Sequence, residues 1–212
     1  MKGRVLLSGL LGAVVLVLWT FVANAVFGFK ARVEMRPVPN ERAVYAALKD
    51  NVVAPGAFMV NPALTPEGRF PDGEPVFAIR TSGLGHEAAG RMFLVEPALG
   101  LLAAMLAALL LAAASPRVLA SYPRKVLFVA GLGALLGLSG EVSRVGIGGY
   151  PPATGLLLAA NVIVGWTLAG LAMAWPARDR AVRDGAAQDD RLIAAGDRAR
   201  SMRRAPGRTG RS

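Results

Sequence analysis

The sequence predicts an all-α membrane protein: a bundle of four transmembrane helices with a small α+β cap on the outside of the membrane, between the first and second spans. Four apolar runs carry this prediction, at residues 5–28, 93–114, 125–142 and 153–175. Each is close to the ~20 residues that a helix needs to cross the hydrocarbon of a bilayer. The second observation is the uneven placement of basic residues around these runs, which predicts how the bundle is oriented.

The composition excludes several classes of functional site. The chain is 54% hydrophobic and contains no cysteine, so it has no disulfide framework, thiol nucleophile or thiolate metal site. His86 is the single histidine, and metal or haem centres ordinarily use more ligands than that. We therefore expect no cofactor, no metal site and no catalytic residue, and the sequence favours a non-enzymatic role.

Residues 1–28 form the first predicted span. A basic start and the small residues Ala23 and Ala25 are also typical of a cleaved signal peptide. The apolar run of residues 5–23 is longer than the ~7–15 residues usual for a signal peptide. We expect a retained anchor, and the sequence leaves cleavage of residues 1–25 open.

Residues 29–92 are expected to form the cap. The stretch VPNERAVYAALKDNV predicts a short helix with Asn40 as its N-cap. The stretch PGAFMVNP predicts an extended segment, and Val76–Thr81 with Arg91–Glu96 predict a small hairpin. A domain of about 64 residues without disulfides is marginally stable, so we expect the cap to need the spans or a partner.

Residues 93–175 are expected to hold the other three spans. Pro97 suits the first turn of a helix, and the run that follows it lacks polar residues. Gly133 and Gly137 have the GxxxG spacing that lets helices approach closely, and Gly165 and Ala169 form a second face of small residues. These four residues are the predicted helix-packing positions, and the glycine faces and the cap are the predicted contact surfaces for a partner.

The basic residues indicate the orientation. They gather at the N-terminus, in the short loop at residues 115–125 and in the tail at residues 176–212. The tail contains ten arginines and five aspartates. With four spans these three pieces lie on one side, which the positive-inside rule assigns to the cytoplasm. We expect a multi-pass protein of a bacterial inner membrane with both termini cytoplasmic, a disordered tail, and no nucleic-acid partner.

Several motifs together resemble a family of uncharacterised bacterial four-span integral membrane proteins. The matching pieces are Pro39–Leu48, Gly56–Pro62, Tyr150–Pro151 and Gly165–Ala174. This sequence departs from the family pattern in its glycine-rich turn before the last span and at Asn161, where the family pattern has an acidic residue. The resemblance implies an architecture and no activity.

Glu141, Arg144 and Asn161 are the candidate ligand-binding residues. Glu141 lies about 24 Å along the third span from its start, near the edge of the hydrocarbon, and Arg144 is within reach at i, i+3. One interpretation is an interfacial ion pair, with Asn161 making an interhelical hydrogen bond. The other is a polar pocket shared by all three residues.

The function that these observations favour is binding to, or assembly with, another membrane component, without catalysis. The expected partners are membrane lipid and another membrane protein. The alternative is a transporter-like or enzymatic protein that handles a small or lipid-like solute through the pocket formed by Glu141, Arg144 and Asn161.

Overall fold

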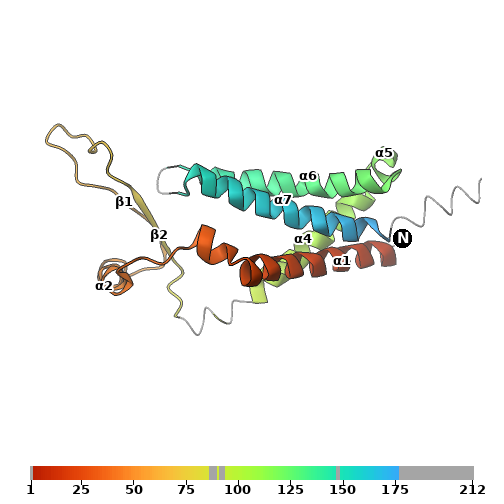
Figure 1. The fold of residues 1–212 in the computed structure, drawn as a ribbon, viewed down its shortest axis with the longest axis horizontal. Coiled ribbons are helices and arrows are strands. Elements are labelled where there is room, and N and C mark those ends of the chain that lie inside the picture. Colours follow the sequence, from red (N-terminus) through yellow and green to blue (C-terminus); the bar gives the residue numbers. More distant parts are fainter. Residues whose placement is uncertain (1, 86–89, 91–93, 147–148, 177–212) are drawn as a thin grey trace, which may run out of the picture.

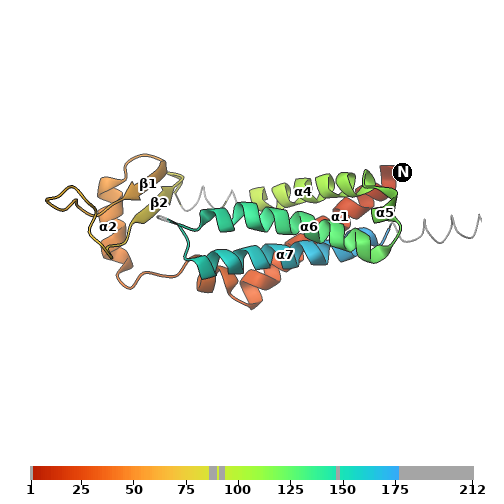
Figure 2. The same ribbon diagram turned by 90° about the horizontal axis from the view of Figure 1, so that it is seen from above.

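The structure is a computed structural model, and it describes residues 2–85, 90, 94–146 and 149–176. In this part of the chain, four long helices pack side by side, and the cap lies beyond one end of them (Figures 1 and 2). All four are long and apolar enough to cross a membrane, which confirms the predicted spans. They are α1 (Lys2–Phe21), α4 (Val95–Ala112), α6 (Tyr122–Gly140) and α7 (Pro152–Ala174).

The two ends of the bundle differ, and we name them for what they carry. The cap end holds helix α2 (Glu41–Asn51) and the strands β1 (Gly56–Val60) and β2 (Phe77–Thr81). The basic end holds the start of α1 and the short helix α5 (Pro116–Leu119) (Figure 2).

Side chains in the bundle are distributed in the opposite way to those of a water-soluble protein. On α6, Leu127 is 72% exposed while Val129 is fully buried. Outward leucines cover the other helices as well, and most of the core consists of small residues. In water such a surface would be one large apolar patch, whereas in lipid large side chains face the acyl chains and small residues let helices pack closely. The chain is therefore a multi-pass integral membrane protein.

The helices pack as two pairs joined through α7. The α6–α7 and α1–α4 contacts are the most extensive, and α1 also packs along α7. Glycine allows close approach in both pairs. A Cβ added at Gly137 would lie 2.9 Å from the carbonyl oxygen of Ala159, and one added at Gly9 would lie 3.2 Å from the Cα of Met105.

The connection between α6 and α7 is short and tied at its base. After α6 ends at Gly140, one 3-10 turn covers Val142–Arg144. The backbone N–H of Tyr150 donates to the carbonyl of Arg144 at 2.9 Å. Helix α7 then begins at Pro152, where the missing N–H of proline costs nothing. This loop forms one wall of the candidate site described below.

The first span ends in a π-helical turn at Val22–Val26, and a second π-helical turn follows it at Lys30–Glu34. They are separated by Gly28, whose positive φ of 62° is accessible to glycine without strain. The second turn packs against α7. The sequence showed the apolar run but not the change of helical pitch, because both helix types need the same apolar residues.

The cap contains the predicted helix, and its hairpin has a different partner strand from the one predicted. Helix α2 begins directly after Asn40, although the Asn40 side chain makes no capping hydrogen bond. β2 pairs antiparallel with β1, with Phe58 opposite Ile79. The predicted strand Arg91–Glu96 was wrong at its end, because Val95 and Glu96 belong to α4.

Several predicted features lie outside the described residues. They are His86, the part of the predicted strand at residues 91–93, and the basic tail from residue 177 onward.

Candidate functional site

Glu141 and Arg144 form an ion pair at the cap end of the bundle. Glu141 is the residue that follows α6, and Arg144 ends the 3-10 turn. Arg144 Nη1 lies 3.4 Å from Glu141 Oε2, and their side chains are 44% and 21% exposed. Charge-assisted hydrogen bonds are usually about 2.7–2.9 Å long, so this pair is loose. Both residues lie at the end of the third candidate span, Tyr122–Arg144.

Asn161 lies deeper and bonds to another helix. Trp19 Nε1–H of α1 donates to Asn161 Oδ1 at 3.0 Å and to its backbone oxygen at 3.2 Å. Gly165, one turn further along α7, makes room for the indole: a Cβ added there would lie 2.7 Å from Trp19 Cδ1. The Asn161 carbonyl groups thus have a partner inside the protein.

The structure brings two of the three candidate ligand-binding residues together. Gly155 of α7 lies at the level of Glu141, because a Cβ added there would lie 3.5 Å from the Glu141 carbonyl oxygen. Asn161 is six residues further along α7, or about 9 Å deeper at ~1.5 Å per residue. Ligand binding by Glu141, Arg144 and Asn161 stays a prediction, and of the three only Arg144 lines the cleft between the hairpin and the bundle.

The predicted packing residues all lie at contacts within the bundle. Gly133 faces Trp166, Gly137 faces Ala159, and Gly165 faces Trp19. Ala169 is fully buried in the core between α4, α6 and α7. Helix α7 therefore fills the glycine face of α6, which is not a free surface for a partner.

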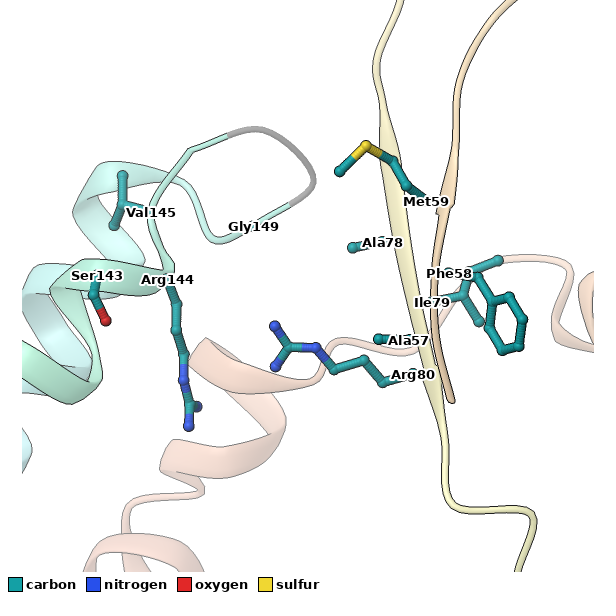
Figure 3. A pocket seen from close by; sticks show the side chains of 10 residues that line it. All are labelled: Ala57, Phe58, Met59, Ala78, Ile79, Arg80, Ser143, Arg144, Val145 and Gly149. Atoms are coloured by element: carbon teal, nitrogen blue, oxygen red, sulfur yellow. The ribbon is translucent and has the colours of Figure 1, made fainter. Parts of the chain in front are cut away.

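A cleft of about 320 Å³ separates the hairpin from the end of the bundle. Residues 57–59 and 78–80 line it from the hairpin, and residues 143–145 with Gly149 line it from the α6–α7 connection. Figure 3 shows the Arg80 side chain reaching from the hairpin towards the bundle and the Arg144 side chain running along the end of the bundle, on the opposite wall. Neither Glu141 nor Asn161 lines the cleft.

The two faces of the hairpin differ in their surroundings. Side chains alternate along each strand, and the register places Ala57, Met59, Ala78 and Arg80 on one face. This bundle-facing side points into the cleft, while Phe58 and Ile79 point away from it (Figure 3).

The face turned away from the bundle is apolar and exposed. We call it the outer hairpin face, and it consists of Phe58, Val60, Phe77 and Ile79. Phe58 is 36%, Val60 45% and Phe77 58% exposed. Ile79 is partly buried, and helix α2, all of which the structure describes, has no buried residue.

Sequence reasoning missed Arg80 and the outer hairpin face. The strand Val76–Thr81 was predicted, and its alternation already separates Arg80 from Phe77 and Ile79. Nothing in the sequence indicated that Arg80 would lie opposite Arg144, because that depends on how the cap sits on the bundle.

Comparison of the chain with family models, with curated proteins and with solved structures finds no match. The four-span architecture that the family resemblance implies is present. Membership of that family stays a prediction.

Proposed function

We propose that this protein is a non-catalytic membrane protein whose cap binds the extracytoplasmic part of a second integral membrane protein. One observation carries the proposal. On the outer hairpin face, the described residues leave Phe58, Val60 and Phe77 exposed to water and bury Ile79 only in part.

The hairpin gains stability when this face is covered. A two-stranded sheet is marginal in water without a third strand or a packed layer, and the described sheet has only β1 and β2. Fully burying a side chain such as Phe77 or Val60 contributes about 1.5–3 kcal/mol. Within the described part of the chain each strand also has one unpaired edge, to which a partner can add a strand.

The position of the face favours a protein partner over lipid. Phe58 and Ile79 of the outer hairpin face point away from the bundle (Figure 3), and therefore away from the membrane that the bundle crosses. The cap is attached to a span at each end, so a partner anchored in the same membrane meets it at a high effective concentration.

The orientation is part of the proposal. We propose that the basic end faces the cytoplasm of a bacterial cell and that the cap lies outside. Lys2, Arg4, Arg117 and Arg124 at the basic end support this through the positive-inside rule. A reporter fused after Ser212 should be active only in the cytoplasm, and activity only outside would contradict the orientation.

Site-specific photo-crosslinking in intact cells tests the docking. A benzoylphenylalanine at position 77 should give one discrete adduct with another membrane protein. The same group at Asp72, an exposed cap residue outside the strands, is the matched control and should give none. Equal adducts at both positions, no adduct at position 77, or an adduct only between two copies of this chain would overturn the proposal.

A further inference from the structure

We propose that the cleft between the hairpin and the bundle binds the phosphate group of an anionic phospholipid of the same membrane. This site uses the bundle-facing side of the hairpin, so it goes beyond the proposed docking and does not depend on it. The inference rests on the charge of the cleft, on its depth relative to the membrane, and on the residues that line it.

The charge of the cleft suits a phosphate. Arg80 has no hydrogen-bond or ion-pair partner within the described part of the chain, and Arg144 engages only Glu141, through one loose contact. A guanidinium carries five N–H donors, so both groups keep donors for a ligand. Two arginines against one nearby carboxylate leave the cleft positive, and planar guanidinium groups bind phosphate oxygens in pairs.

The level of the cleft favours lipid as the source of the phosphate. Arg144 is the last residue of the third candidate span, and this is where lipid headgroups begin. A phosphate held there comes from a molecule that is already concentrated at that depth. Free inorganic phosphate offers the same chemistry, and the experiment below separates the two sources.

The remaining lining suits the carbon atoms of a lipid. Ala57, Met59 and Ala78 line the hairpin wall, and Val145 lines the opposite wall (Figure 3). The volume of about 320 Å³ is at the lower end of the ~300–1,000 Å³ of small-molecule sites. A phosphate between Arg80 and Arg144 would also hold the hairpin against the bundle, because the described residues form no ion pair between these two walls.

Lipid retention by the full chain tests the inference. The protein is extracted from nanodiscs that contain phosphatidylcholine and phosphatidylglycerol, and the lipids that stay bound are counted by native mass spectrometry. We expect selective retention of phosphatidylglycerol, reduced about five-fold by Arg80→Gln and by Arg144→Gln, as one surface arginine contributes ~1 kcal/mol. Arg69→Gln, in the cap but outside the cleft, is the matched control and should retain the wild-type amount.

Two further arms keep the outcome decisive. Glu141→Gln breaks the ion pair but leaves both guanidinium groups, so this variant should retain at least as much phosphatidylglycerol as the wild-type protein. A loss equal to that of Arg144→Gln would show that the ion pair matters only for folding, and it would overturn the proposal. Millimolar inorganic phosphate should not displace the lipid. Displacement by inorganic phosphate, or unchanged retention in Arg80→Gln, would also overturn it.

Discussion

The bundle and the cap expose apolar side chains to a similar degree, but the same exposure has opposite meanings in the two regions. Leu127 on α6 is 72% exposed and Phe77 in the cap 58%. Lipid covers Leu127 because it lies within a membrane span, whereas the described residues leave more than half of Phe77 open to water. The bundle thus needs only lipid to cover its outward side chains, and the proposed function assigns the exposed side chains of the hairpin to a partner.

The largest expected effect is a loss of stability of the bundle. Gly137→Leu places a side chain against the Ala159 backbone, since even a Cβ there would lie 2.9 Å from the Ala159 oxygen. Backbone atoms cannot move aside as a flexible side chain can, so we expect a loss of about 1–3 kcal/mol in the free energy of unfolding. Unfolding by SDS in mixed micelles, followed by tryptophan fluorescence, measures it.

Gly131→Leu is the matched control on the same helix. A Cβ at Gly131 meets nothing within 4 Å, so the added side chain faces lipid and the helix propensity changes in the same way. Equal stability of the two variants would mean that α6 and α7 do not approach each other at Gly137.

The next effect concerns the hydrogen bond that joins Trp19 of α1 to Asn161 of α7. Trp19→Phe keeps most of the ring but removes the N–H that bonds to Asn161. Interhelical hydrogen bonds in membranes contribute about 0.6 kcal/mol on average and up to ~1.7 kcal/mol, so we expect a loss in that range. A double-mutant cycle with Asn161→Leu isolates the bond, and strictly additive losses would show that it contributes nothing.

A smaller effect on stability is expected for a substitution in the cap. Phe77→Ser removes a ring that is 58% exposed and lies opposite Val60 in the sheet, so the free energy of unfolding of the purified protein should fall by no more than about 1 kcal/mol. The same variant should lose the crosslinked or co-purified membrane partner. A purified protein destabilised by several times that amount would indicate that Phe77 is a core residue of the cap itself.

The smallest effect is a local titration in the cap. Hydrogen bonds from its own backbone N–H, and then from the Thr65 hydroxyl, hold the pKa of the Glu67 carboxyl below its usual value. The ionised form is favoured, so this turn is most stable above the ordinary carboxyl pKa and weakens as the pH falls through the lowered one. Thr65→Val should raise the pKa of Glu67 in an NMR titration, and an unchanged midpoint would contradict the contact.

The spans were predictable from sequence because a single physical requirement, enough consecutive apolar residues to cross the bilayer, acts on each helix separately. The packing glycines followed from their spacing. The hairpin partner was not predictable in the same way: Arg91–Glu96 and Gly56–Val60 both read as short apolar segments, and only the start of α4 at Val95 decides between them.

The candidate site depends on contacts between segments far apart in the chain, which sequence patterns do not report. Asn161 was expected to bond across helices, but its partner Trp19 follows only from the packing of α1 on α7. The i, i+3 spacing of Glu141 and Arg144 was local and could be read directly. Arg80 opposite Arg144 follows from how the cap rests on the bundle, so it required the structure.

Hydrogen exchange of the full chain in two settings tests the central contrast most directly. Amide exchange is compared between purified protein in nanodiscs and protein in native membrane vesicles, with the nanodiscs made from lipid extracted from those vesicles. Amides in α6 and α7 should be equally protected in both settings, and those in β1 and β2 should be protected only in the native vesicles. Strands that are equally protected in the purified protein would show that the cap is complete without a partner.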